Sequence, residues 1–171
     1  LDSIGAINQN PTACGNAPLF FENHGYVFSY KSENYRPDNG NSGICAIRAN
    51  DRFVYTQDGN TLDKRSLTNG ALITSVQIPG GISVAAFGFN QPGNSGIDID
   101  SCGNVYVGSA DRVIKYDANL TVISSQTVGF RVFDVTVSTN GNIIVAGADG
   151  DNTMTRKGYV QSINMSACAP F

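Results

Sequence analysis

Residues 96–117 read GIDIDSCGNVYVGSADRVIKYD, and this stretch decides the fold. Isoleucines alternate with aspartates over 97–100, and two valines flank a tyrosine over 105–107. Gly103 and Asn104 mark one tight turn, and the polar residues at 109–111 mark another. An alternation of period two between tight turns predicts short antiparallel strands. With further strands expected at 113–116 and 120–125, the stretch predicts a four-stranded meander.

The same pattern recurs on both sides of this stretch. DVTVSTNGNIIVAGA (134–148) places Val135 and Val137 at the positions of Ile97 and Ile99, 38 residues further on. Upstream, GICAIRANDRFVYTQDGNTLDKRSLTNGALITSVQI (43–78) shows the same order of strands and turns. Its alignment places Phe53 and Tyr55 at the positions of Val105 and Val107. The chain is therefore expected to repeat one small antiparallel sheet.

Four-stranded units at a spacing of about 40 residues are typical of a β-propeller. We predict an all-β chain with a single β-repeat domain over 1–171 and about three to four blades. The predicted division is a partial first blade and loop over 1–42, followed by blades over 43–80, 96–128 and 132–165. A part of a longer propeller is the favoured interpretation. A ring completed by a second chain, a three-sheet prism and a sandwich are the alternatives.

The composition restricts the classes of partner. Only 15% of the residues are charged and the net charge is −3, with lysines and arginines scattered along the chain. No basic patch is formed, so binding to nucleic acid is not expected. A membrane span is not expected either, because no run of about 18 apolar residues occurs. The chain begins at Leu1 and not at Met, which is consistent with a mature product, a proteolytic piece or a cut domain.

The four cysteines are Cys14, Cys45, Cys102 and Cys168. They form no CxxC pair and the only histidine is His24, so a zinc site is not indicated. An even number of cysteines in a chain of low charge favours disulfides and an oxidising compartment. Three pairings exist. Cys14–Cys45 with Cys102–Cys168 is favoured because each bond would link neighbouring units, and four buried thiols are the alternative.

Acidic side chains are the candidates for chemistry. Asp98 and Asp100 stand two residues apart on one expected strand and project from the same face. Asp149 and Asp151 lie close together in the stretch ADGDNT (148–153). Such carboxylates could hold calcium or act as an acid and a base, whereas turn capping is the structural alternative. We predict no catalytic residue and no cofactor, with calcium at these four aspartates as the alternative.

Two stretches carry a resemblance to a known class of proteins: NSGIDIDSCGNVYVGSADRVIKYDANL (94–120) and GADGDNTMTRKGYVQSINMSACAPF (147–171). Over about residues 43–171 the chain resembles propeller-like segments of large secreted surface proteins of the Bacteroidetes. Those proteins often end in a gliding-motility-associated sorting domain for type IX secretion. The resemblance implies export to the cell surface and a role in adhesion or surface structure, with no catalytic residues to transfer.

The sequence therefore predicts a non-catalytic extracellular or cell-surface module. Contacts are expected through loops at 31–43, 88–95 and 148–157, and the partners would be other protein modules, surface glycans, further blades or a second chain. A calcium-dependent hydrolase or lyase of the propeller type is one alternative. A fragment or subunit that completes a larger propeller is the other.

Overall fold

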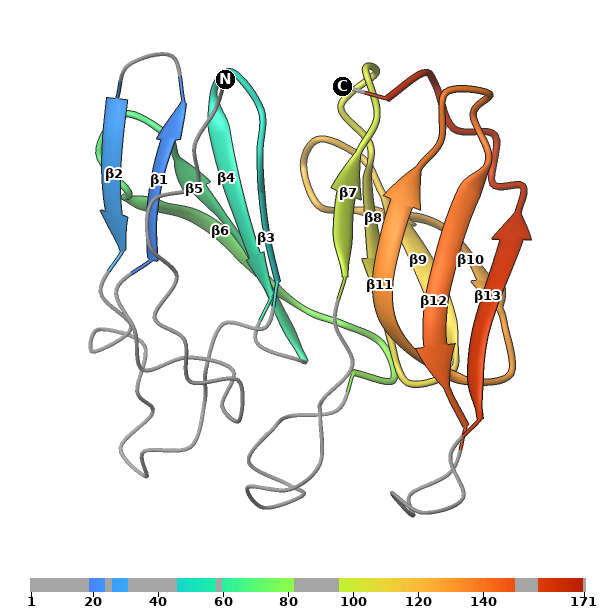
Figure 1. Ribbon diagram of the computed structural model, residues 1–171. Coiled ribbons are helices and arrows are strands. Elements are labelled where there is room, and N and C mark those ends of the chain that lie inside the picture. Colours follow the sequence, from blue (N-terminus) through green and yellow to red (C-terminus); the bar gives the residue numbers. More distant parts are fainter. Residues whose placement is uncertain are drawn as a thin grey trace, which may run out of the picture.

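The computed structural model is built of β-strands joined by turns (Figure 1). It describes the strands at 19–23 and 26–30, and then residues 46–57, 60–81, 96–149 and 157–170. These residues contain no helix. Strands β1 (Leu19–Asn23) and β2 (Tyr26–Tyr30) pair with each other as an antiparallel hairpin.

Three antiparallel sheets come after this hairpin, and in each one the strands lie in sequence order. Sheet I contains β3 (Ala46–Ala49), β4 (Phe53–Gln57), β5 (Thr61–Ser66) and β6 (Leu72–Gln77). Sheet II contains β7 (Ile97–Ile99), β8 (Val105–Gly108), β9 (Arg112–Tyr116) and β10 (Val122–Thr127). Sheet III contains β11 (Arg131–Val137), β12 (Ile143–Ala148) and β13 (Gly158–Ile163), three strands in the described part of the chain. The predicted all-β fold of four-stranded antiparallel sheets is confirmed.

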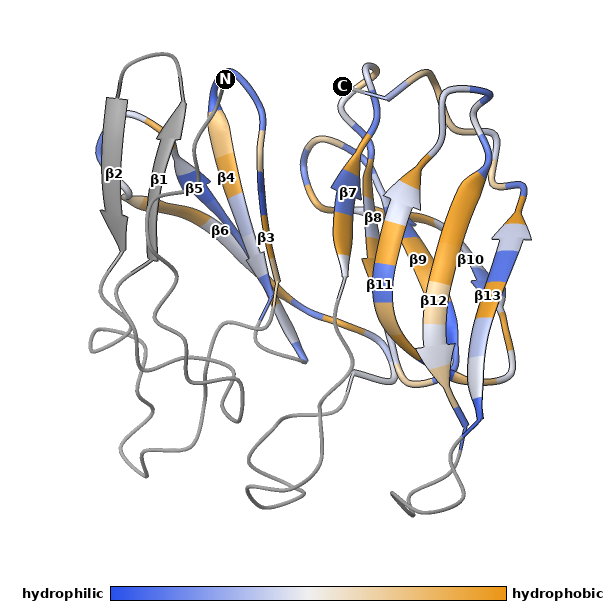
Figure 2. Cartoon of the chain, viewed as in Figure 1, coloured by the Kyte–Doolittle hydropathy of each residue, from blue (hydrophilic) through white to orange (hydrophobic). Residues whose placement is uncertain are grey.

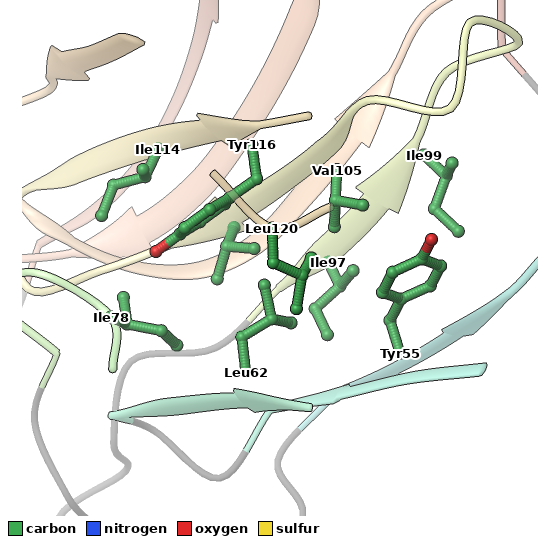
Figure 3. Close-up of a cluster of buried hydrophobic side chains, with 10 residues drawn as sticks. Tyr55, Leu62, Ile78, Ile97, Ile99, Val105, Ile114, Tyr116 and Leu120 are labelled. Atoms are coloured by element: carbon green, nitrogen blue, oxygen red, sulfur yellow. The ribbon is translucent and has the colours of Figure 1, made fainter. Parts of the chain in front are cut away.

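Sheet II lies between the other two sheets. Its first strand, β7, is in contact with the first strands of both neighbours, β3 and β11. The two faces of sheet II then bury separate hydrophobic clusters, and the one against sheet I is drawn in Figure 3. The cluster between sheets I and II is Tyr55, Leu62, Ile78, Ile97, Ile99, Val105, Val107, Ile114, Tyr116 and Leu120. The cluster between sheets II and III is Tyr106, Val113, Phe130, Val132, Val135, Val137, Ile143, Val145, Ile163 and Met165.

Sheets stacked face to face, with their first strands side by side, are the arrangement of propeller blades. The structure is thus a partial β-propeller. Alternation along the strands explains why one sheet supplies both clusters, because successive side chains point to opposite faces. In β8, Val105 and Val107 face sheet I, whereas Tyr106 between them faces sheet III.

Glycine is required where β7 begins. Gly96 has a φ of 103°, a backbone conformation that residues with a side chain rarely adopt. A Cβ added there would lie 2.7 Å from the backbone nitrogen of Val135 in β11. The close approach of the first strands of sheets II and III therefore depends on the missing side chain at this position.

The predicted alignment of sheet I with sheet II is wrong by one residue. Tyr55 pairs with Arg48 and Lys64, and faces sheet II. Its counterpart in sheet II is Tyr106 and not Val107. Tyr106 pairs with Asp98 and Lys115 and faces sheet III. The cause is the turn after the first strand. It closes between Asn50 and Phe53 in sheet I, but between Asp100 and Asn104 in sheet II, which is one residue longer.

Candidate functional site

The polar group with the most hydrogen bonds in the described part of the chain is the carboxylate of Asp100, which is fully buried at the end of β7. Its Oδ1 accepts the backbone N–H groups of Cys102 at 3.1 Å and Asn104 at 2.9 Å. Its Oδ2 accepts the Asn104 side-chain amide at 2.8 Å and the Tyr106 hydroxyl at 2.9 Å. The same oxygen accepts the backbone N–H of Cys168 at 3.1 Å. Asp100 thus joins its own turn to a segment 68 residues away.

That segment, residues 164–170, comes after β13 but lies against sheet II. A disulfide joins Cys168 to Cys102, with Cα atoms 5.9 Å apart. The backbone N–H of Ser101 donates to the carbonyl of Ala169 at 2.8 Å, and Asp100 forms a β-bridge with Pro170. The expectation of a disulfide is confirmed at this pair, whereas Cys14 and Cys45 lie outside the described residues.

The hydrogen bonds determine the ionisation of this group. Burial by itself raises the pKa of the Asp100 carboxyl, but the donors from Asn104, Cys168 and Tyr106 outweigh it and lower the pKa below its usual value. The pKa of Tyr106 is raised, first by burial and then by its bond to Asp100. The pair is therefore an ionised carboxylate that accepts a hydrogen bond from a neutral phenol.

Asp98 connects all three sheets. Its Oδ1 lies 2.8 Å from the Nε atom of Arg48 in β3, and accepts the backbone N–H of Ile99 at 2.9 Å. Its Oδ2 accepts the backbone N–H of Val137 in β11 at 2.7 Å. The Asp98 side chain is only 4% exposed, whereas that of Arg48 is 55% exposed. The carboxylate therefore holds the first strands of the three sheets together.

Two buried lysines form a repeated contact that the sequence analysis missed. Lys64 in β5 donates to the carbonyl of Ala118 in the next sheet at 2.6 Å. Lys115, at the same position in β9, donates to the carbonyls of Met165 at 3.3 Å and Ser166 at 3.0 Å. Each ammonium group thus reaches backbone carbonyls of the segment that packs on its sheet. A signal was present only in VIKYD, where Lys115 stands between Ile114 and Tyr116, whereas in LDKRS the neighbours of Lys64 are charged.

The geometry around Asp98 and Asp100 does not fit a calcium ion. Among the described residues, Asp100, Cys102 and Cys168 are close enough to form a metal group, with candidate ligand atoms within 4.8 Å of one another. The two sulfur atoms, however, are bonded to each other. Calcium takes six to eight oxygen ligands, and the carboxylate oxygens of Asp98 and Asp100 already accept N–H and O–H donors. These contacts favour a structural role for both residues.

Asp149 follows β12 at one end of the stacked sheets, whereas the Asp100 turn lies at the other end (Figure 1). It accepts the backbone N–H of Lys157 at 2.9 Å and the hydroxyl of Tyr159 at 2.7 Å. These two donors lower the pKa of its carboxyl, the Tyr159 bond more than the other. Asp151, His24 and the predicted loops at 31–43 and 88–95 lie outside the described residues. In the part of the chain that the structure describes, no helix has the length and hydrophobicity needed to cross a membrane.

Comparison with solved structures gives matches of low sequence identity. The extracellular domain of a protein assigned to the hybrid two-component systems of Bacteroides thetaiotaomicron is 14% identical, with a TM-score of 0.51 over 84% of this chain and 21% of that one. The β-propeller domain of Cps50 (Swd1) from Myceliophteria thermophila is 15% identical, with a TM-score of 0.46 over 68% of this chain and 38% of that one. A protein of unknown function from Bacteroides caccae is 16% identical, with a TM-score of 0.49 over 90% and 59%.

At such identities the likeness concerns the fold alone. The chain spans between about a fifth and three fifths of the length of these three structures. No model of a protein family matches the chain. No curated protein sequence matches it either.

Proposed function

We propose that this chain is a non-catalytic extracellular module that binds other protein modules or surface glycans through segments at one end of its sheets. The observation that carries the proposal is the difference between the two ends of the stacked sheets (Figure 1). At the upper end in Figure 1, the turns after β3, β7 and β11 are tight, and segment 164–170 is tied down by the disulfide.

At the lower end in Figure 1, strands β3, β7 and β13 begin and strand β12 ends. In the sequence, segments 31–45 and 82–95 precede β3 and β7, and segment 150–156 stands between β12 and β13. Described polar side chains at this end include Asp111, whose carboxylate pairs with Arg112 at 2.7 Å, and Asp149. Loops on a rigid scaffold commonly carry binding residues, so this end is the candidate binding surface.

The two carboxylates that were candidates for catalysis or metal binding are occupied by contacts that hold the sheets together. Asp98 joins three sheets and Asp100 holds five donors, which supports a role without catalysis. The proposal includes one β-repeat domain over 1–171 with the partial blade over 1–42. An extracellular location is part of it, because disulfides persist in oxidising compartments and the Bacteroides thetaiotaomicron structure is itself an extracellular domain. The gliding-motility and type IX secretion assignment stays a prediction.

The test replaces the segments at 88–95 and 150–156, one at a time, with glycine and serine. Binding of the purified chain to immobilised polysaccharides and to immobilised outer-membrane proteins is measured, together with the melting temperature. We expect at least one replacement to abolish binding without a change in melting temperature. Thr139→Ala, at an exposed position of the opposite end, is the matched control and should bind normally. Full binding by every segment variant, or no binding by the unmodified chain, would contradict the proposal.

A second candidate is a part of a larger propeller. The face of sheet III that points away from sheet II carries Ile144 and Ala146, both half-buried, beside the exposed Thr136 and Ser162. In sheets I and II the corresponding faces are covered by the next sheet. A further blade could pack on this face of sheet III in the same manner.

A further inference from the structure

Strand β13 has the position of a third strand but the exposure of an outermost strand. The third strands β5 and β9 are mostly buried, and each is flanked by a fourth strand, β6 or β10. In β13, residues 158–162 are all exposed. Residues 122–125 of the outermost strand β10 are exposed in the same way. Val160 is 77% exposed, the highest value among the exposed large hydrophobic side chains of the described residues. Among the described strands, none pairs with the outer backbone edge of β13.

This edge also lacks the irregularity of the other outer edges. The pairing of β5 with β6 shifts register between Lys64 and Arg65, and the pairing of β9 with β10 shifts between Val122 and Ser124. Bulges of this kind twist an edge strand away from new partners. The pairing of β12 with β13 runs through six consecutive residue pairs without a shift. β13 is thus the regular outer edge among the three sheets.

The chain itself does not fill this edge with the residues that come after β13. Segment 164–170 turns back to sheet II, where Lys115 binds two of its carbonyls and Cys102 binds it covalently. The fourth strand of sheet III has to come from outside these residues.

We propose that β13 pairs antiparallel with β13 of a second copy of this chain, with Val160 opposite Val160. The strand GYVQSI contains no charged residue, so pairing with itself brings no like charges together. In this register Tyr159 lies opposite Gln161 and Gly158 opposite Ser162, each pair occurring twice across a two-fold axis. An isologous contact of this type closes as a dimer.

The Val160 side chains of the two copies then cover each other, and each β13 becomes the fourth strand of its partner's sheet. Backbone hydrogen bonds between edge strands supply the main attraction, as in other cases of strand addition. The contact uses the edge of sheet III and not the lower end of the sheets, so it does not depend on the proposed binding function.

The first test measures the molar mass of the full chain by light scattering over a range of concentrations. We expect a concentration-dependent dimer of the 18.1 kDa chain, and Val160→Lys should weaken it about tenfold or more, because lysine blocks an edge strand. Ile123→Lys is the matched control. Ile123 is 52% exposed, lies at the bulge of β10 and should leave the dimer unchanged. Circular dichroism melting shows that each variant is folded.

The second test probes the register with cysteine. Directly opposed residues in an antiparallel pair have Cα atoms about 4.5–5.5 Å apart, within reach of a disulfide. Val160→Cys should form a covalent dimer on a non-reducing gel, whereas Ser162→Cys and the unmodified chain should not. A monomer at all concentrations, a dimer insensitive to Val160→Lys, or cross-linking by Ser162→Cys alone would each overturn the proposal. A dimer of the unmodified chain that binds no ligand would count against the proposed function only.

Discussion

The third strands of sheets II and III, β9 and β13, each pair with the second strand of their sheet but lie in opposite environments. β9 is largely buried, and its Lys115 is only 8% exposed among carbonyls of segment 164–170. In β13 the equivalent position is Ser162, which is exposed. Strand β12 beside β13 is mostly hydrophobic, whereas β13 contains both polar and apolar residues (Figure 2). The burial of each strand is therefore determined by the segments that pack on it, and not by its own periodicity.

The turns after the first strands provide the largest expected contrast. Asp100 in sheet II accepts five hydrogen bonds, whereas the equivalent Ser138 in sheet III bonds its own turn through the Asn142 carbonyl at 2.7 Å. Asp100→Ala leaves buried donors unpaired and should lower the free energy of unfolding by about 3–5 kcal/mol. Ser138→Ala should cost about 1 kcal/mol. Urea unfolding of both variants measures the difference, and equal losses would show that the two turns contribute alike.

The same substitution changes the response to acid. The pKa of Asp100 is lower in the folded chain than its usual value of 3.8, so the unfolded chain takes up this proton more readily. The stabilisation is therefore complete above the usual pKa and is lost as the pH falls through it towards the lowered folded value. In Asp100→Ala this acid-dependent part of the unfolding free energy should be absent, which urea unfolding between pH 3 and pH 6 would reveal.

The lysine positions give a smaller contrast. Lys115→Met removes the donor of two backbone carbonyls and should lower the free energy of unfolding by about 1–3 kcal/mol. Ser162→Lys introduces a lysine at the equivalent position of β13, where no described segment packs, and should change the free energy by less than about 0.5 kcal/mol. Thermal unfolding of both variants tests this. A clear gain in Ser162→Lys would mean that sheet III is already covered in solution.

The strands of sheet II were predictable because they are short, alternate strictly and are separated by turn residues. The pattern of Ile97, Ile99, Val105 and Val107 is local, and each strand of sheet II was placed within a few residues of its observed bounds. The face of each residue in sheet I was not predictable. One residue less in the turn after Asn50 moves Tyr55 to the other face, since side chains alternate with period two.

The roles of the candidate site residues could not be predicted for a different reason. Asp98 contacts Val137, 39 residues away, and Asp100 contacts Cys168, 68 residues away. Local sequence shows two carboxylates on one strand, for which turn capping is the favoured role and calcium binding the alternative. Only the stacking of the sheets shows that strand N–H groups, a phenol and a guanidinium use these oxygens. Lys64 and Lys115 were overlooked because a lysine in a strand usually marks an exposed position.

The two tyrosines on opposite faces of sheet II should respond to phenylalanine with opposite signs. The Tyr106 hydroxyl donates to Asp100, so Tyr106→Phe leaves that carboxylate short of a donor and should cost about 1–2 kcal/mol. The Tyr116 hydroxyl is buried and has no hydrogen-bond partner in the described structure. Tyr116→Phe removes an unpaired polar group and should be neutral or stabilise by up to about 1 kcal/mol. Urea unfolding of both variants at neutral pH measures the two effects.

Alkaline unfolding tests the burial of the Tyr116 hydroxyl. Burial raises the pKa of Tyr116 to about 12 from its usual 10.0, so the folded chain favours the neutral phenol. This contribution is fully present below pH 10 and is lost as the pH rises towards 12. Unfolding free energies measured from about pH 8 to about pH 11 should therefore fall less steeply in Tyr116→Phe than in the unmodified chain. An unchanged slope would mean that burial does not raise the pKa of Tyr116. A destabilised Tyr116→Phe would mean that the hydroxyl has a partner and that the two faces of sheet II are more alike than the contacts of Tyr106 and Tyr116 indicate.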